Sequence, residues 1–370
     1  RDQLHVDTAI DQMYRGLTPR GAESKDFILR RVADDKQWRF ERIPGATGED
    51  EPAHGFTDRW VGGWKDYKDY LRRSGLGEFV DQHPGIGNHN VAPSGPDDTH
   101  SYSLLPAEHH VESFLTGEAI RFLEEQKGRP EPFCMVLSLY GPHLPVAPPK
   151  PWDAMYPPDN VPLPKNHRDD MAGKPKHQRT NAAYKLPTWT EAQFKDYVSR
   201  YWGYCSFIDD LLGKVFKKLE ETGEGDNTIV VFTTDHGDMV AAHGSIWKLS
   251  RCGYEELYNV PFLISWPSRW KGGRTVDALT GSVDIFPTLL ELTGVAMPPG
   301  VQGKSFSRML DGKTTEHRDT AFSDCQGQSF IVRSGRWKYC AHWSPRDVEE
   351  LYDLKADPGE LKNLAVKRVR

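Results

Sequence analysis

The sequence lacks the features that define several large classes of protein. Its five cysteines are scattered and form no Cys-x-x-Cys pair, which argues against a disulfide framework or a zinc site. No apolar run approaches the roughly 20 residues that a membrane-spanning helix needs. The net charge is −6 with both signs interspersed, so the composition indicates no surface for nucleic acid or for an anionic membrane. The cellular compartment stays open.

The length of the chain predicts more than one domain. At 370 residues it exceeds what one compact core usually holds, so a large domain with a smaller one is expected. From Thr320 onward, short runs predict antiparallel strands, with a hairpin turn near Ser334 and Gly335 and a closing helix at the end. We therefore expect a main domain over residues 1–312 and an antiparallel subdomain over 313–370.

Two stretches carry the apolar spacing of helices. Residues 112–126 and 190–222 both place apolar side chains on one face, and the second begins with capping residues. Asp209 and Asp210 lie inside the second stretch, where neighbouring side chains point about 100° apart. We therefore interpret this pair as structural and not as a metal site.

The central stretch of the chain runs from Asp226 to Lys248 and joins an apolar run to acidic and imidazole side chains. Residues 228–232 are apolar and β-branched without polar alternation, which suits a strand buried on both faces. Asp235 and His236 follow at the end of the strand, where open α/β sheets bind ligands. A carboxylate and an imidazole there are typical of a divalent-metal site, although an ordinary polar surface loop uses the same residue types.

More candidate site residues follow the ends of apolar runs. His243 and Lys248 lie downstream of the central strand and suit an anionic substrate. A second apolar run, residues 133–140, predicts another buried strand, after which prolines on both sides display His143. Because parallel strands end at one edge of a sheet, we expect His143 to share a pocket with Lys248 and with the Asp235–His236 pair.

The phrase FTTDHGDMVAAHG, followed by Trp-Lys, resembles a conserved segment of the sulfatase family, within the alkaline-phosphatase-like superfamily. The resemblance covers at least residues 111–364 and includes a Pro-His-x-Pro element at residues 142–145. It implies that a carboxylate and an imidazole bind a divalent metal, and that a histidine and a lysine contact the sulfate. Asp235 is the carboxylate and His236 the imidazole of the implied metal site. His143 and Lys248 are the implied sulfate contacts.

The same resemblance implies an α/β fold, a three-layer sandwich with a mixed, mainly parallel central sheet and a small C-terminal antiparallel α+β subdomain. The implied activity is hydrolysis of a small-molecule or glycan sulfate ester by a formylglycine nucleophile. The implied metal is most favourably Ca²⁺, with Mg²⁺ or Mn²⁺ as alternatives. His143 and Lys248 are then catalytic candidates, and His243 is a further substrate contact. His5 is a weaker candidate contact, because Gln3 stands where the family has lysine, which favours an ordinary terminal histidine.

The family's Asp-Asp metal pair and its Cys/Ser-x-Pro-x-Arg nucleophile motif have no counterpart in the expected places. Ser265 to Arg269 spells Ser-Trp-Pro-Ser-Arg, but the Lys-Gly-Gly at residues 271–273 opposes the helix that follows the nucleophile in the family. We therefore expect a missing N-terminal segment of the same protein to supply the nucleophile, and to add strands between those at 133–139 and 228–232. Two alternatives stay open: a phosphodiesterase or phosphonate monoester hydrolase on this scaffold, and a non-catalytic member that binds anions or glycans.

Overall fold

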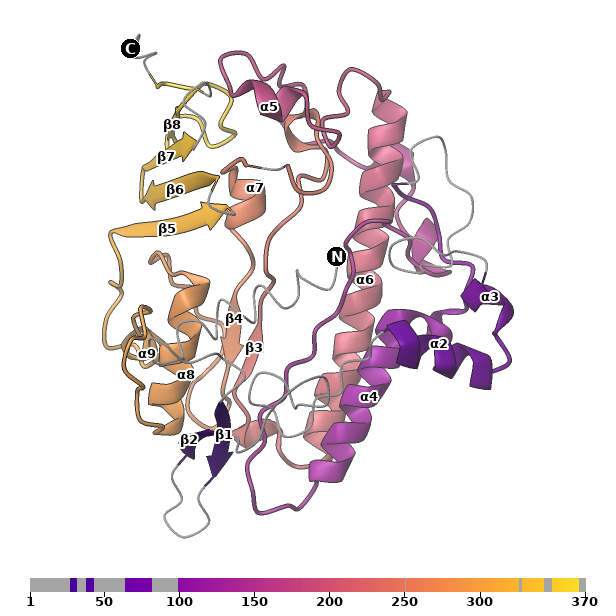
Figure 1. The fold of residues 1–370 in the computed structure, drawn as a ribbon, viewed down its shortest axis with the longest axis vertical. Coiled ribbons are helices and arrows are strands. Elements are labelled where there is room, and N and C mark those ends of the chain that lie inside the picture. Colours follow the sequence, from indigo (N-terminus) through magenta and orange to yellow (C-terminus); the bar gives the residue numbers. More distant parts are fainter. Residues whose placement is uncertain are drawn as a thin grey trace. The chain divides into compact units, whose positions relative to one another are not determined.

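The computed structural model describes residues 27–31, 38–42, 64–81, 99–249, 251–325, 328–342 and 348–365. The chain forms two compact units. The smaller unit comprises Arg1–Val61, Gly273–Ser323 and Val332–Gly335, and the larger unit comprises Gly62–Gly272, Asp324–Ile331 and Arg336–Arg370. Helices and sheets are both present, as an α/β fold requires (Figure 1). Across the described residues, none of the helices combines the length and the apolarity needed to span a bilayer.

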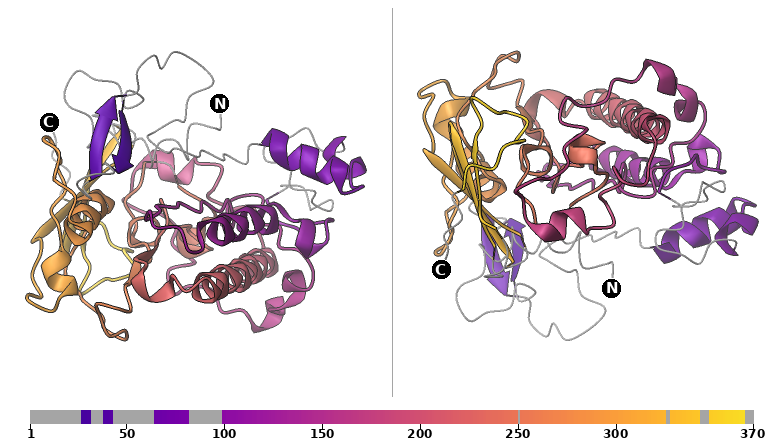
Figure 2. Two further views of the ribbon diagram at one scale, coloured as in Figure 1. Left: turned by 90° about the horizontal axis from the view of Figure 1, so that it is seen from below. Right: turned by 90° about the horizontal axis from the view of Figure 1, so that it is seen from above.

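Two long helices of the larger unit, α4 (Val111–Gln126) and α6 (Glu191–Glu221), lie side by side (Figures 1 and 2). A capping box starts α6: the Thr190 hydroxyl accepts from the Gln193 backbone, and the Gln193 side chain accepts from the Thr190 backbone. Both helices agree with the predicted bounds to within one residue at each end, so these predictions are confirmed. Asp210 forms an ion pair with Lys214 at 2.9 Å, in keeping with its structural interpretation.

The central strand of the sequence pairs differently from the prediction. β3 (Val230–Phe232) pairs antiparallel with β4 (Leu263–Ser265), and among the described residues this sheet has two strands. The strand predicted at 133–140 is wrong for this structure, because the segment pairs with no strand among the described residues and a strand exists only through pairing. Its alternate side chains Phe133, Met135 and Leu137 pack on a cluster from α4 and α6, while Val136 is 58% exposed.

The C-terminal part forms a four-stranded sheet in the order β5-β6-β7-β8. Its strands are β5 (Thr320–Cys325), β6 (Ser329–Ser334), β7 (Trp337–His342) and β8 (Glu350–Asp353). β7 and β8 are antiparallel, and β6 and β7 flank the predicted hairpin turn. The predicted closing helix is wrong through residue 365, because the chain after the turn runs back along β8. There Leu364 donates its backbone N–H to the Leu351 carbonyl at 2.8 Å.

The other elements are short. The remaining strands are the antiparallel pair β1 (Phe27–Arg31) and β2 (Trp38–Arg42). In the described ranges the remaining α-helices are α2 (Trp64–Arg73), α3 (Glu78–Asp81), α5 (Lys176–Arg179), α7 (Glu255–Tyr258), α8 (Ile285–Thr293) and α9 (Ser307–Leu310). Single 3-10 turns lie at Ala107–His109, Trp152–Ala154, Pro158–Asn160, Gly225–Asn227, Ala242–Gly244 and Ser282–Asp284.

Candidate active site

The turn after β3 presents a carboxylate and an imidazole together. The Asp235 carboxylate accepts from the His236 backbone N–H at 2.9 Å, so it folds back over the turn. The His236 ring donates its Nδ1–H to the Gly237 carbonyl at 2.7 Å. That bond fixes the tautomer and leaves the lone pair of Nε2 available, 3.5 Å from Asp235 Oδ2. A ring nitrogen held this way is typical of a metal-binding histidine.

The loop from residue 239 to 248 returns to the same place. Its backbone is unusual, with positive φ at Val240, Ala241, His243, Gly244 and Trp247. Non-glycine residues in this conformation cost on the order of 1 kcal/mol each, so the surroundings must hold the loop in place. The loop is closed by backbone hydrogen bonds, such as that from the Met239 N–H to the Trp247 carbonyl at 3.0 Å.

Asp238 clamps both ends of this loop. Its Oδ1 accepts from the backbone N–H groups of Val240 and Trp247, each at 2.9 Å, and the Tyr197 hydroxyl of α6 donates to it at 3.3 Å. Burial raises the pKa of Asp238 to about 6, against the opposing effect of these hydrogen bonds. Lys248 follows directly, and its Nζ lies 3.4 Å from His236 Nε2.

His143 reaches the cluster from a separate segment. The turn from Tyr140 to His143 closes with a hydrogen bond from the His143 N–H to the Tyr140 carbonyl at 3.2 Å. The imidazole donates from Nδ1 to the Leu144 carbonyl at 2.8 Å and accepts at Nε2 from the Trp247 indole at 3.3 Å. The structure therefore brings His143, Lys248 and the Asp235–His236 pair together, as the sequence predicted.

The cluster is half-buried, and its groups influence one another. Burial lowers the pKa of His143, and the nearby Lys248 and His236 lower it further, so the ring is neutral at neutral pH. Burial also lowers the pKa of Lys248, while the carboxylates of Asp235 and Asp238 oppose that shift. The result is the Lys248 ammonium, a hydrogen-bond donor suited to a tetrahedral anion, beside the Nε2 atoms of His143 and His236.

The turn after β3 contains the two residues that the sequence predicted as metal ligands. Asp235 and His236 offer one carboxylate and one imidazole nitrogen, and their 3.5 Å separation suits two ligands of one ion. Within the described ranges, no group of three or more histidine, cysteine or acidic residues gathers as a metal-binding set. A hard dication that prefers about six to eight oxygens would need further ligands.

His243 does not join the cluster. Its side chain is fully buried, donates from Nδ1 to Asp169 at 2.6 Å and accepts at Nε2 from Asn166 at 3.0 Å. The ring stacks on Tyr254 with centroids 4.0 Å apart, and Lys174 pairs with the same Asp169 carboxylate. The structure therefore places the predicted substrate contact in a structural network that anchors the loop. His5 lies outside the described residues.

Two other candidates from the sequence and the structure do not form the site. Ser265 ends β4 opposite Val230, whereas the cluster lies beyond the other end of β3. Ser329, His342 and Glu350 form a hydrogen-bonded array like a catalytic triad, at 2.8 and 2.9 Å. All three side chains are at most 2% exposed, so no substrate reaches the hydroxyl.

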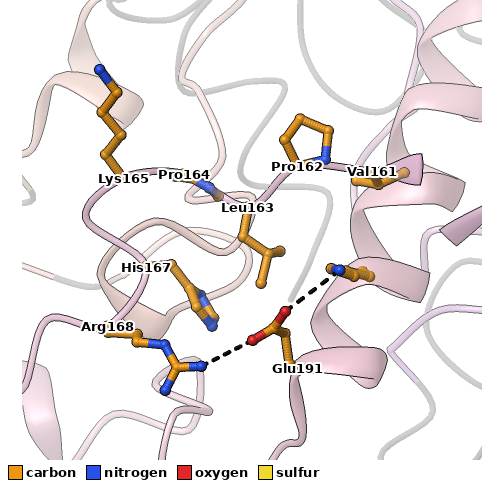
Figure 3. Close-up of a pocket in the computed structure, with 9 residues that line it drawn as sticks. Val161, Pro162, Leu163, Pro164, Lys165, His167, Arg168 and Glu191 are labelled. Atoms are coloured by element: carbon orange, nitrogen blue, oxygen red, sulfur yellow. Dashed lines mark hydrogen bonds and ion pairs between the residues drawn. The ribbon is translucent and has the colours of Figure 1, made fainter. Parts of the chain in front are cut away.

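The pocket in Figure 3 has a volume of about 310 Å³ and lies beside the start of α6. Glu191 lines it and bonds both Arg168, at 2.9 Å, and Lys195, at 3.4 Å (Figure 3). The Glu191 carboxylate thus neutralises part of the positive charge of Arg168 and Lys195, which would otherwise attract an anion to this pocket. His167 also faces this pocket, and its Nδ1 donates to the Ala241 carbonyl.

Comparison with known proteins assigns the class. The model of the sulfatase family matches residues 44–295, and a model named for the C-terminal region of N-sulphoglucosamine sulphohydrolase matches residues 243–369. The chain belongs to the sulfatase family. Sequence reasoning found the residues that face the cluster but missed Asp238, although the motif Asp-His-Gly-Asp contains it.

Among curated relatives, the chain is 29% identical over 315 residues to a multifunctional alkaline phosphatase superfamily protein of Trinickia caryophylli, covering 75% of this chain and 59% of the relative. It is 35% identical over 202 residues to a Δ4,5-hexuronate-2-O-sulfatase of Bacteroides thetaiotaomicron, covering 51% and 40%. The mouse arylsulfatase K is 32% identical over 192 residues, covering 48% and 34%. The chain thus spans about a third to three fifths of these relatives.

Solved structures show the same fold. A phosphonate monoester hydrolase of Silicibacter pomeroyi matches with a TM-score of 0.70 and 23% identity, covering 89% of this chain and 72% of that one. A protein solved with its substrate D-glucosamine-2-N,6-O-disulfate matches with a TM-score of 0.57 and 25% identity, covering 69% and 65%.

Proposed function

We propose that the protein acts in the hydrolysis of sulfate esters, and that His143 and Lys248 bind the sulfate group. The observation that carries this proposal is the convergence of Lys248, His143 and the Asp235–His236 pair at the end of β3. A sulfate ester carries one negative charge, and a lysine ammonium contributes a charge-assisted hydrogen bond of about 1.5–3 kcal/mol. The Trp247 indole donates a hydrogen bond to His143 Nε2 and so holds the imidazole beside Lys248.

Asp235 and His236 would hold a divalent cation, most favourably Ca²⁺, with Mg²⁺ or Mn²⁺ as alternatives. When bound, such an ion stabilises negative charge on ester oxygens. His236 supports this role because its Nδ1 is already engaged with a backbone carbonyl. Lys248 would keep the sulfate oriented, and neutral His143 would accept or return a proton at Nε2.

The formylglycine nucleophile and the remaining metal ligands would come from a segment outside these 370 residues. We propose that it also supplies strands beside β3 and the segment 133–140, which completes a three-layer sandwich with a mainly parallel sheet. Support comes from the exposed apolar side chains of Val136 (58%) and Leu263 (64%). The division into domains at residues 312 and 313 belongs to the same proposal.

The substrate we propose is a sulfated sugar. Relatives named as a hexuronate-2-O-sulfatase and an N-acetylglucosamine-6-O-sulfatase support this class. Hydrolysis of phosphonate monoesters is the second candidate, supported by the fold shared with a solved phosphonate monoester hydrolase. Both esters are monoanions, so the single ammonium of the cluster suits either.

The test is anion binding by calorimetry at pH 7, with inorganic sulfate and methylphosphonate as probes. Lys248→Met is expected to weaken sulfate binding by about tenfold or more, equivalent to 1.4 kcal/mol. Lys217→Met is the matched control, because Lys217 is an exposed lysine of α6. Equal sulfate affinity in both variants would overturn the proposal, and binding of methylphosphonate alone would favour the second candidate.

A further inference from the structure

Glu112 is a buried carboxylate that the proposed chemistry does not use. It lies in the first turn of α4 with 0% of its surface exposed. In the described part of the chain, no lysine, arginine or histidine forms an ion pair with it, and hydrogen bonds alone stabilise its charge. A charged group in this position is costly, so its contacts indicate what it does.

Those contacts are concentrated on one turn. Oε1 accepts from the Gly141 backbone N–H at 2.6 Å, and Oε2 accepts from the Tyr140 N–H at 3.2 Å. The Tyr204 hydroxyl of α6 also donates to Oε1, at 3.2 Å. The turn is pressed closely against this pair, since a Cβ on Gly141 would lie 2.5 Å from the Tyr204 ring.

The same turn carries His143 into the candidate active site. His143 follows Gly141 by two residues, and its backbone N–H closes the turn on the Tyr140 carbonyl. Its ring packs against the Tyr140 ring with centroids 4.8 Å apart, and Nε2 meets the Trp247 indole at 3.3 Å. Any change that loosens the two amide bonds to Glu112 therefore moves the imidazole relative to Trp247.

We propose that Glu112 is a positioning residue: its carboxylate fixes the Tyr140–His143 turn and thereby the imidazole of His143, and protonation of Glu112 releases that turn. The importance of His143 rests on the proposed function, while the link from Glu112 to the turn does not. A protonated carboxyl group has one oxygen that carries the proton. That oxygen becomes a donor and a poorer acceptor, so the hydrogen bond from one of the two amides weakens.

The ionisation falls in an accessible range. Burial raises the pKa of Glu112 to about 7, against the lowering effect of the bonds from Gly141, Tyr140 and Tyr204. Among the described residues, Tyr140 lies on the turn itself, and the neighbours with shifted pKa values are Tyr204 on α6, Tyr67 on α2 and His110 at the start of α4. Burial raises the pKa of Tyr204 and Tyr67 far above neutrality and lowers that of His110 to about 3. These three neighbours therefore keep one charge state while Glu112 titrates.

The sequence offers a specific probe of this turn. Tyr140–Gly141 is the only Tyr-Gly dipeptide in the chain. Protein labelled with carbonyl-¹³C tyrosine and ¹⁵N glycine therefore gives a single amide signal in a carbonyl-selected NMR spectrum. We expect this Gly141 amide to lie far downfield at pH 8 and to shift upfield on acidification, with a midpoint near pH 7.

Three variants complete the test. Glu112→Gln should abolish this titration, whereas Glu125→Gln, the same change at an exposed position of α4, should leave it unchanged. Any titration that persists in Glu112→Gln reports His143 instead. Should Glu112→Gln fail to fold, Tyr204→Phe removes one donor and should move the midpoint upward. A Gly141 signal that does not shift between pH 6 and 8, or that titrates equally in Glu112→Gln, overturns the proposal.

Binding of inorganic sulfate separates this proposal from the proposed function. We expect the sulfate affinity of the native protein to fall on acidification, with the same midpoint as the Gly141 signal. In Glu112→Gln this pH-dependent fall in affinity should be absent. A Gly141 signal that titrates in a protein that binds no sulfate would refute the proposed function and leave the role of Glu112 in place. Sulfate binding that depends on Lys248, together with a Gly141 signal that does not titrate, would refute the role of Glu112 and leave the proposed function in place.

Discussion

Replacement of Gly237 by alanine tests whether the Asp235–His236 turn packs where the structure places it. A Cβ at this position would lie 1.9 Å from the Glu256 carbonyl oxygen, a backbone atom at α7. Ordinary contact begins at 3.4 Å, so the two segments must separate by about 1.5 Å. The hydrogen bond from the Gly237 N–H to the Leu257 carbonyl, at 2.9 Å, resists that separation.

The expected loss follows from these two contacts. Overpacking costs about 1–3 kcal/mol, and a lost buried backbone hydrogen bond adds about 1 kcal/mol. Gly237→Ala should therefore lower the free energy of unfolding by about 2–4 kcal/mol. It should also weaken sulfate binding, because the Gly237 carbonyl holds the His236 ring.

Gly213→Ala is the matched control in the same protein. Gly213 is exposed in the middle of α6, with nothing within 4 Å of a Cβ built there. This change should raise the free energy of unfolding by up to about 1 kcal/mol, the helix propensity difference between the two residues. Urea denaturation followed by circular dichroism measures both variants. Equal stability of Gly237→Ala and the native protein, with sulfate binding retained, would show that the turn does not rest on α7.

Three further outcomes are expected. The pKa of Glu112 is raised to about 7 in the folded protein from 4.5, so between these pH values the folded state retains a proton that the unfolded state has lost. The free energy of unfolding should therefore fall as pH rises from about 4.5 to 7. Urea titrations of Glu112→Gln should show a smaller fall, and the same pH dependence in both proteins would contradict the raised pKa of Glu112. Asp169→Asn leaves the buried Lys174 unpaired and should cost about 3–5 kcal/mol in the same assay, and a loss below about 1 kcal/mol would refute the network. The 370-residue chain alone should show no turnover of an aryl sulfate and weak Ca²⁺ binding in calorimetry, because the cluster formed by the described residues offers one carboxylate and one imidazole. Robust turnover would show that the chain contains a nucleophile that this reasoning missed.

The elements that the sequence predicted well are those set by local signals. The helix α6 was predictable because its apolar spacing and its capping box lie within the helix itself. The segment 133–140 was not, because an apolar run predicts a strand only when a partner pairs with it. Its side chains alternate between partly buried and exposed, which the prediction of a buried strand did not include.

The candidate site divides in the same way. His143, Asp235, His236 and Lys248 were found because each follows an apolar run or belongs to a motif. His243 was misplaced, because the same motif contains it and nothing in the sequence distinguishes a ring facing a substrate from a ring bonded to Asp169. That distinction depends on a residue 74 positions away.

Buried carboxylates explain why the remaining site residues escaped prediction. Each turn of the site leaves backbone N–H groups that no helix or sheet pairs, and buried N–H groups need acceptors. Glu112 accepts from the turn that carries His143, and Asp238 accepts from both ends of the loop that carries Lys248. Asp169 accepts from His243 and so holds the middle of that loop. An acidic residue in the sequence looks the same whether it is exposed or fills this role, so motifs predicted the residues of the cluster, while the fold identifies the carboxylates that hold their turns.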